Sequence, residues 1–255
     1  MLTDVRQRRT AELILRQGSA SVPELAKALG VSEATVRRDL DFLAESGLVE
    51  RVRGGACRPR GARAEADAAA FDEVATQEPS EKRSIARAAA RLVRDGDVVA
   101  MDIGTTVFSM CQYLRNRELT VVTASLAVVR ELAGSPGIDI IVMGGVLRPS
   151  YHSMVGVLTE SCLRQVRVDV AFLGAAGVRA DGTVLDSTHS EVPVKRAMID
   201  IASSAWLLAD HNKFPGAGFL EVAPISRFSG LVTDRPLAPG QLLLPEDSPV
   251  EVKIP

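Results

Sequence analysis

Six short runs of mainly apolar sequence, rich in Val and Ile, are spread over residues 98–234 and separated by stretches with helical periodicity. The runs are VVAMDIG (98–104), LTVVTAS (119–125), IDIIVMGG (138–145), VDVAFLG (168–174), AWLLAD (205–210) and GLVTD (230–234). Strands that alternate with helices pair in parallel and are covered by helices on both faces. We therefore predict an α/β domain with a mainly parallel sheet flanked by helices.

The domain begins near Ser80, where SEKRSIARAAARLVRDGD predicts a helix with one apolar face that stops at Asp95-Gly96. Residues 58–79, rich in Ala, Arg and acidic residues, show no clear period and are predicted to be a linker. This divides the chain into a module over 1–57, the linker, and a large domain over 80–255.

Composition bounds the class of protein. Of the 255 residues, 46% are apolar and 24% charged, as in soluble globular proteins. No apolar run is long enough to span a membrane, and the segment MLTDVRQRRT is not a signal peptide. Cys57, Cys111 and Cys162 form no CxxC pair, which argues against disulfides or zinc. We expect a soluble protein of the cytoplasm.

Charge is distributed unevenly along the chain. Residues 1–63 hold 12 Lys and Arg against 8 Asp and Glu, whereas the remainder holds 18 against 24. The N-terminal module is therefore positive although the whole chain has a net charge of −2. Positive charge gathered at one end points to a polyanionic partner.

The module is predicted to begin with three helices, the first over residues 3–17. Ser21 is placed to cap the second helix, with Pro23 in its first turn and Glu24 completing a capping box. Gly30 ends that helix, and Ser32 caps a third in which Val36, Leu40 and Leu43 face inward. Two short helices joined by a tight turn are typical of a helix-turn-helix.

The outer face of the third helix carries Ala34, Arg38 and Asp41, with Thr35 and Arg37 beside them. Arginine there reads guanine edges or pairs with phosphate. The segment LVERVRGGA (48–56) predicts a short strand with a basic tip, as in a wing. The predicted contacts to double-stranded DNA are Ser32, Ala34, Thr35, Arg37, Arg38, Arg51, Arg53 and Gly54. A helical protein-interaction module is the alternative, and it predicts no salt-dependent affinity for DNA.

Small and polar residues follow the strands of the large domain. Ligands of parallel α/β sheets bind beyond the carboxyl ends of the strands, where glycine, hydroxyls and lysine suit a phosphate. The residues at these ends are Asp102, Gly104, Thr105, Thr106, Thr123, Ser125, Gly144, Gly145, Gly174, Gly177, Asp210 and Lys213. We predict an anion site, with Asp102 or Asp210 accepting hydrogen bonds from sugar hydroxyls.

Other chemistries find little support. The phosphate-binding pattern GxxxxGK[ST] is missing from the sequence, which argues against a nucleotide triphosphatase. The histidines at 152, 189 and 211 have no metal-ligand spacing. We expect neither a metal nor a cofactor.

The chain resembles the DeoR family of bacterial transcriptional regulators over nearly its whole length. The resemblance is carried by SVPELAKALGVSEATVRRDLDFLAESGLVERVRGGA, SEKRSIARAAARLV, DIGTT, VVTAS, MGG, AFLGAAGV, VKRAMI and ADHNKF, in that order. It implies a winged helix-turn-helix followed by a sensor domain similar to ribose-5-phosphate isomerase, which binds a sugar phosphate. It also implies a homo-oligomer, dimer or tetramer, and regulation of a sugar operon, with repression favoured.

Carried over to this chain, the resemblance makes Thr105, Thr106, Ser125 and Lys213 phosphate ligands. It places Asp102, Gly104, Gly145 and Lys195 nearby. The family usually has Asn at the position of Ala124, so this loop departs from the pattern. An isomerase with an added DNA-binding head is the alternative function. Against it, the stretch Leu173–Gly177 offers no carboxylate where the isomerases have acid–base residues, so no catalytic residue is predicted.

Overall fold

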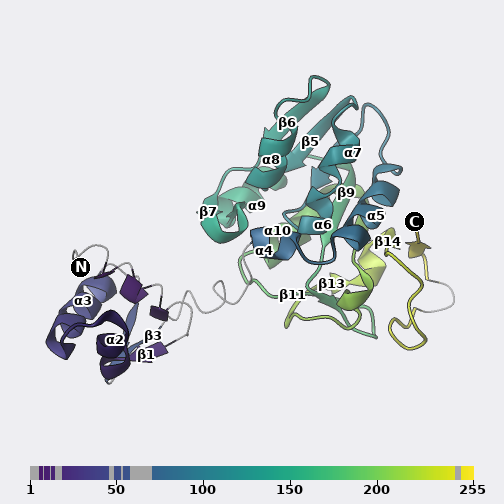
Figure 1. Ribbon diagram of the computed structural model, residues 1–255. Helices are drawn as coiled ribbons and strands as arrows, with labels where there is room; N and C mark the ends of the chain where they lie inside the picture. The colour runs from purple at the N-terminus through teal and green to yellow at the C-terminus, as the bar shows by residue number, and fades with distance from the viewer. Residues whose placement is uncertain are drawn as a thin grey trace. The chain divides into compact units, whose positions relative to one another are not determined.

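The computed structural model describes residues 6, 7, 9–11, 13, 14, 19–45, 49–52, 54–57, 71–244 and 248–255. The chain divides into two compact units, Met1–Ala68 and Ala69–Pro255 (Figure 1). The helix expected over residues 3–17 is helical at its described positions, and its remainder lies outside the described residues. Arg53 and most of the expected linker, residues 58–70, also lie outside them.

The second helix of the first unit, α2 (Val22–Leu29), begins and ends as its sequence dictates. The Ser21 side chain accepts from the Glu24 backbone, and the Glu24 carboxylate accepts from the Ser21 backbone amide at 2.8 Å. This capping box satisfies amides that have no partner within the helix. Gly30 closes α2 in the left-handed region, at φ 65°, where glycine carries no steric penalty.

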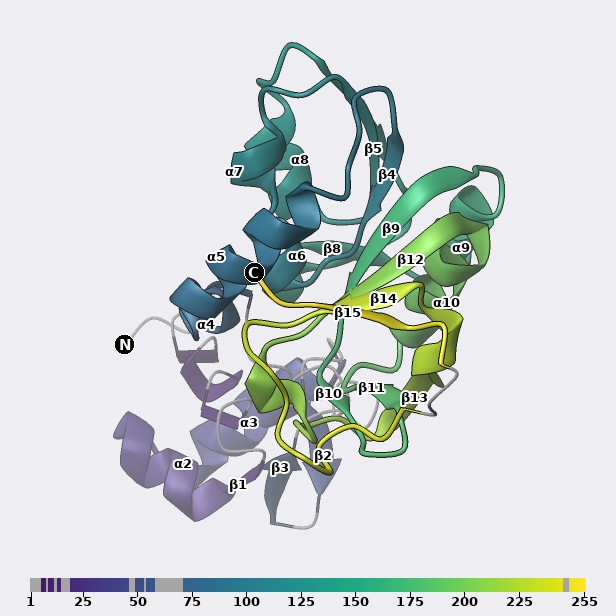
Figure 2. The ribbon, with the colours of Figure 1, turned by 90° about the vertical axis from the view of Figure 1, so that its right-hand side faces the viewer.

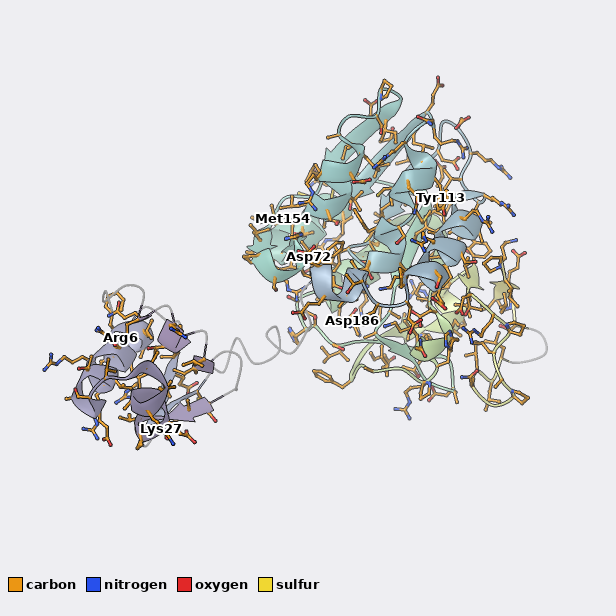
Figure 3. All side chains as sticks on the ribbon, in the orientation of Figure 1. Arg6, Lys27, Asp72, Tyr113, Met154 and Asp186 are labelled. Carbon is orange, nitrogen blue, oxygen red and sulfur yellow. The ribbon has the colours of Figure 1, made fainter. Side chains whose placement is uncertain are left out.

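Helix α3 (Glu33–Glu45) packs its inner face on α2. Val36, Leu40 and Leu43 are buried as predicted, together with Leu25 and Ile14. Asp39 is also buried, and its carboxylate accepts from the Arg6 guanidinium at 2.6 Å. This ion pair, with Arg6 labelled in Figure 3, ties the described part of the first helix to α3.

A three-stranded antiparallel sheet completes the first unit, in the order β1 (Ser19–Ser21), β3 (Gly55–Cys57), β2 (Glu50–Val52). Strands β2 and β3 form the hairpin expected of a wing. Strand β1 was not predicted, because the segment SAS is short and has no alternating pattern. Its close pairing with β3 fixes Gly55, since a Cβ there would lie 2.3 Å from the Ala20 carbonyl oxygen.

The second unit is built on a seven-stranded sheet with the order β15-β14-β12-β9-β4-β5-β6 (Figure 2). Every neighbouring pair in it is parallel. Its strands are β4 (Val98–Met101), β5 (Leu119–Thr123), β6 (Ile138–Val142), β9 (Val168–Gly174), β12 (Ala202–Leu208), β14 (Gly230–Val232) and β15 (Glu251–Lys253). The predicted parallel α/β fold is confirmed, with all six predicted strands present.

Helices cover both faces of this sheet, as Figure 2 shows. One face packs on α9 (Val157–Leu163) and α10 (Val192–Ile201). The other packs on α5 (Pro79–Ala90), α6 (Thr105–Phe108), α7 (Cys111–Leu114) and α8 (Leu126–Leu132). Phe172 and Trp206 are buried in this second layer, as predicted. Helix α5 ends at Ala90 rather than near Gly96, because residues 91–96 form turns.

Several smaller elements were not anticipated. They are β15, the antiparallel sheet β10 (Gly177–Val178), β11 (Thr183–Asp186) and β13 (Leu220–Pro224), the hairpin β7 (Val146–Arg148) and β8 (Ser153–Val155), and helix α4 (Phe71–Ala75). Three single turns of 3-10 helix are η1 (Pro149–Tyr151), η2 (His211–Lys213) and η3 (Ile225–Arg227). Strands of two to five residues carry too few positions for a period to be recognised.

Candidate functional sites

Helix α3 presents the predicted DNA-facing residues on the surface of the first unit. Ala34, Arg37 and Arg38 are exposed, and Thr35 is half-buried. The Ser32 hydroxyl accepts from the Thr35 amide at 3.2 Å and so caps the helix. A capped helix whose outer face bears paired arginines has the shape and charge to enter a major groove.

The arginines of this unit differ in their ion-pair partners. Arg37 pairs with Glu33 one turn earlier, at 2.7 Å. Arg51 contacts the Asp41 carboxylate at 3.1 Å and donates to the Gly55 carbonyl at 3.1 Å. Arg38 forms no ion pair with any residue that the structure describes, which leaves its guanidinium ready for an external anion. Gly54 turns the chain between β2 and β3 at φ 86°.

The second unit places a buried charge cluster at the carboxyl ends of β4 and β9. The Lys195 ammonium, from α10, donates to the Asp102 carboxylate at 2.5 Å and to the Gly174 carbonyl at 2.9 Å. The same Asp102 oxygen, Oδ2, accepts from the Gly174 amide at 3.0 Å. The other oxygen, Oδ1, is buried and has no hydrogen-bond partner among the described residues. One acceptor of this cluster is thus unused.

A second carboxylate completes the charge cluster. Asp186, labelled in Figure 3, lies 3.5 Å from the Lys195 ammonium, and its other oxygen accepts from the amides of residues 187 and 188. Burial alone would lower the pKa of Lys195, but the charges of Asp102 and Asp186 outweigh it and the pKa is raised. The cluster therefore contains a fixed cation and carries a net charge of −1.

The hairpin β7–β8 adds residues to this site that sequence reasoning missed. The buried Arg148 pairs with Glu191, which also accepts from the Ser153 hydroxyl at 3.3 Å. The Arg148 guanidinium lies 5.4 Å from the ring centre of Tyr151. Burial raises the pKa of Tyr151 to about 12, and the positive charge of Lys195 opposes this rise. The sequence signal available was RPSY, which begins two residues after the MGG motif.

A second group of charges follows β12, the neighbour of β9. Asp210 is buried and accepts from the Asn212 amide at 3.0 Å, which starts the turn that carries Lys213. Lys82 of α5 feels the charges of both Asp210 and Lys213, and its pKa is lowered by burial first and by Lys213 next. Glu78 also acts on Lys82 and raises its pKa, so this group combines two lysines with two carboxylates. Lys82 was not predicted as a site residue.

The predicted hydroxyl residues and glycines that follow β4 or end β5 are Gly104, Thr105, Thr106 and Thr123. Thr105 and Thr106 are buried at the start of α6, and Gly104 lies against the Asp102 carboxylate. Thr123 is already engaged, donating to the Met101 carbonyl at 2.7 Å and accepting from the Ser125 amide at 3.0 Å.

The Ser125 hydroxyl caps α8 through the Val128 amide. Gly145 is required by the fold, because a Cβ there would lie 2.0 Å from the Thr159 hydroxyl, and Gly144 accepts from that hydroxyl at 2.8 Å.

His211, which directly follows Asp210 in the chain, pairs with the Asp234 carboxylate at 2.9 Å. No group of three or more His, Cys, Asp or Glu in the described part of the chain is arranged to hold a metal ion. Within the same residues no helix is long and apolar enough to cross a membrane.

Comparison with known proteins identifies the family. Residues 6–60 match the DeoR-like helix-turn-helix domain, and residues 77–235 match the DeoR C terminal sensor domain. The glycerol-3-phosphate regulon repressor of Escherichia coli is 35% identical over 226 residues, 88% of each chain. The L-fucose operon activator of Haemophilus influenzae is 30% identical over 231 residues, 89% of this chain and 91% of that one. The chain belongs to the DeoR family of transcriptional regulators.

This membership confirms the predicted family and the prediction that the chain is a regulator rather than an isomerase. A solved structure of ribose 5-phosphate isomerase A from Methanocaldococcus jannaschii aligns with 54% of this chain and 55% of its own, at 19% identity and a TM-score of 0.40. Within the stretch 173–177, Leu173 is buried in the core. Gly177 lies where a Cβ would be 2.2 Å from the Ala217 carbonyl oxygen.

Proposed function

We propose that this protein is a metabolite-controlled repressor of a sugar or polyol catabolic operon, released from its operator by a phosphorylated effector. Residues 1–57 bind the DNA, residues 58–79 link the units, and residues 80–255 bind the effector. The observation that carries the proposal is the outer face of α3, where Arg38 is exposed and unpaired among the described residues while the opposite face is buried core.

DNA contact is assigned to Ser32, Ala34, Thr35, Arg37, Arg38, Arg51, Arg53 and Gly54. Arg38 is the residue best placed to reach base edges. Because Arg37 and Arg51 hold acidic partners within the unit, DNA phosphates must compete for these two side chains. A double-stranded partner is favoured because the major groove admits a helix of this kind.

Effector binding is assigned to the carboxyl ends of β4, β5, β6, β9 and β12. Two charge groups lie there, and each suits a different part of a sugar phosphate. We assign the phosphate to Lys213 and Lys82, together with the hydroxyls of Thr105, Thr106 and Ser125. The negative cluster of Asp102, Asp186 and Lys195 suits hydroxyl donors, with the unused Asp102 Oδ1 as acceptor. Gly104, Gly144, Gly145, Thr123 and Asp210 shape the site around them.

The experiment for the effector is a thermal-shift panel of sugar and polyol phosphates that includes glycerol 3-phosphate, with inorganic phosphate and the unphosphorylated sugars as controls. A ligand at about a thousand times its Kd stabilises the fold by about 4 kcal/mol. A specific hit that also weakens binding to DNA from the protein's own operon supports the proposal. If no compound of the panel raises the unfolding temperature and none changes the affinity for DNA, the proposed effector binding is contradicted.

Two further features belong to the proposal. We expect the protein to act in the cytoplasm, where its DNA is, and as a homo-oligomer, since a helix-turn-helix dimer reads two half-sites. Repression is favoured over activation by the relative with the higher identity, a repressor at 35% against an activator at 30%. A transcription assay with and without effector tests the sign directly.

A further inference from the structure

Apolar side chains surround the hairpin β7–β8 on the outside of the sensor unit. Val146 and Leu147 keep 66% and 46% of their surface exposed, and Val157 and Leu158 at the start of α9 keep 73% and 67%. Figure 1 shows β7 and α9 together at one margin of the unit. A Cβ at Gly156 would lie 4.0 Å from the Val146 side chain, so β7 and the start of α9 are in contact. We call these four residues the hairpin patch.

The hairpin patch continues along the sheet edge. Strand β6 ends the sheet order and has a single strand neighbour, β5. Its last two residues, Ile141 and Val142, are exposed by 41% and 43% and precede β7 by only three positions. An apolar edge strand with unpaired backbone groups is normally covered in a native protein.

We propose that a second copy of this chain covers the hairpin patch and the β6 edge, forming a two-fold subunit interface. Four large side chains with such exposure present an apolar area on the order of a few hundred Å², the size at which exposed apolar surface marks an interaction site. With the β6 edge they supply much of the roughly 800 Å² that each partner buries in a stable interface.

The chemistry of the surface favours this occupant over DNA. The hairpin patch holds no charge, and residues 64–255 are acidic overall, with 18 Lys and Arg against 24 Asp and Glu. An apolar patch that meets its own copy is self-complementary, as a two-fold interface requires. The inference rests on the proposed function, because an operator with two half-sites requires two DNA-binding units.

The hairpin that carries the patch also reaches the charge cluster. Leu147 faces solvent, while the next residue, Arg148, is buried against Glu191 at the start of α10. The Glu191 carbonyl in turn accepts from the Lys195 amide at 2.9 Å, so the partner of Arg148 is bonded to the residue that supplies the cation of the cluster. A ligand that alters the cluster therefore acts on the same short hairpin that forms the subunit contact. The interface is the element through which effector binding changes the spacing of the DNA-binding units.

The test is sedimentation equilibrium of the full-length chain over a range of concentrations. The double variant Val157→Glu, Leu158→Glu places two charges in the patch, where acidic residues suit the first turn of a helix. Leu243→Glu is the matched control, since Leu243 is 63% exposed and lies outside the patch. Val146→Lys is a second variant on a different element, in case the double variant does not fold.

We expect the wild type and Leu243→Glu to be dimers or larger and the patch variants to dissociate, with a subunit Kd at least 100-fold higher. A monomeric wild type, or folded patch variants with wild-type mass, would overturn the interface. Thermal-shift and DNA-binding measurements on the same samples test the proposed function separately from the subunit interface. If the wild type responds to effector and binds operator but the patch variants keep the wild-type mass, the interface is refuted and the proposed function is not.

Discussion

At the scale of single residues, the DNA-facing arginines differ although they are adjacent. Arg37 is held by Glu33 at 2.7 Å, whereas Arg38 has no ion-pair partner among the described residues. We expect Arg38→Ala to weaken operator binding by about 1–3 kcal/mol, if its contact is bidentate to guanine. The loss for Arg37→Ala should be smaller, because forming its DNA contact first requires breaking the pair with Glu33.

Fluorescence anisotropy with operator DNA measures both variants, and Arg164→Ala on the exposed surface of the sensor unit serves as the control. Equal affinities for wild type and Arg38→Ala would remove α3 from the DNA interface.

Lys195 is expected to matter for stability before it matters for binding. Its side chain is buried between two carboxylates, so Lys195→Met leaves both negative charges without a cation. Removing one partner of a buried ion pair costs about 3–5 kcal/mol. Urea unfolding should show this loss, and adding Asp102→Asn should recover part of it. A loss below about 1 kcal/mol would mean that water already screens the cluster.

The pH dependence of this pair has a definite sign. Because folding raises the pKa of Lys195, the ion pair contributes its full stability below the unfolded lysine pKa of about 10.4. That contribution is lost as the pH rises through the higher folded value. The free energy of unfolding of the wild type should therefore fall above about pH 10.4, and that of Lys195→Met should lack this component. Identical alkaline profiles would contradict the assignment.

At the scale of elements, the first unit is small and depends on its caps. Ser21→Ala removes the hydroxyl that accepts from the Glu24 amide and donates to the Glu24 carboxylate at 2.7 Å, and leaves only the bond from the residue 21 amide to that carboxylate. We expect the first unit to lose about 1 kcal/mol, seen as an earlier transition in thermal unfolding monitored by circular dichroism. The effect should not extend to the sensor unit, and Ser109→Ala inside that unit gives the comparison. Loss of stability in both units at once would show that they unfold together.

Local signals could be recognised from sequence: the capping box of Ser21 and Glu24, the glycine that ends α2, and the six apolar runs. A cap or a periodic pattern depends only on residues that are close together in the chain. Strand β1 was not predictable, since it becomes a strand only by pairing with the distant β3. The strands of hairpin β7–β8 have three residues each, too few for a period to be recognised.

The candidate site was predicted from the position of residues rather than from their contacts. Strand ends are where ligands bind in a parallel sheet, and Asp102 and Lys213 were chosen as candidates on that ground. The pair of Arg148 and Glu191 joins residues 43 positions apart, and no spacing in the sequence signals such a contact. The sequence also does not show that the Thr123 hydroxyl bonds the Met101 carbonyl and the Ser125 amide, because these bonds depend on the neighbouring strand and the following turn.

At the scale of the whole molecule, the first unit is basic and the sensor unit is acidic. DNA affinity should therefore fall steeply with salt, because neutralised phosphates release counterions. We expect a linear decrease of the logarithm of the binding constant with the logarithm of salt concentration. Arg38→Ala should reduce the slope by about 1 if its contact is to phosphate. Titrations at four or more salt concentrations measure this, and salt-independent binding would favour a protein-interaction module.

Coupling between the units has a candidate anchor at Phe71, which belongs to the predicted linker and is the first residue that the structure describes after Cys57. Its buried ring lies 5.4 Å from Phe108, 5.6 Å from Tyr151 and 5.8 Å from His152, measured between ring centres. The Tyr151 ring in turn lies 5.4 Å from the Arg148 guanidinium, which pairs with Glu191 at the start of α10. This part of the predicted linker is thus packed on the turn of the hairpin β7–β8, which contacts the start of α10.

We expect Phe71→Leu to uncouple effector binding from DNA release. Leucine keeps the site apolar, so the variant should still fold, but it removes the aromatic contacts with Tyr151 and His152. The effector should raise the unfolding temperature of the variant as it does for wild type, while the effector-induced change in operator affinity shrinks severalfold. Phe219→Leu, at an exposed ring, is the matched control. If Phe71→Leu releases operator as wild type does, the signal bypasses this packing and the hairpin acts through the subunit interface alone.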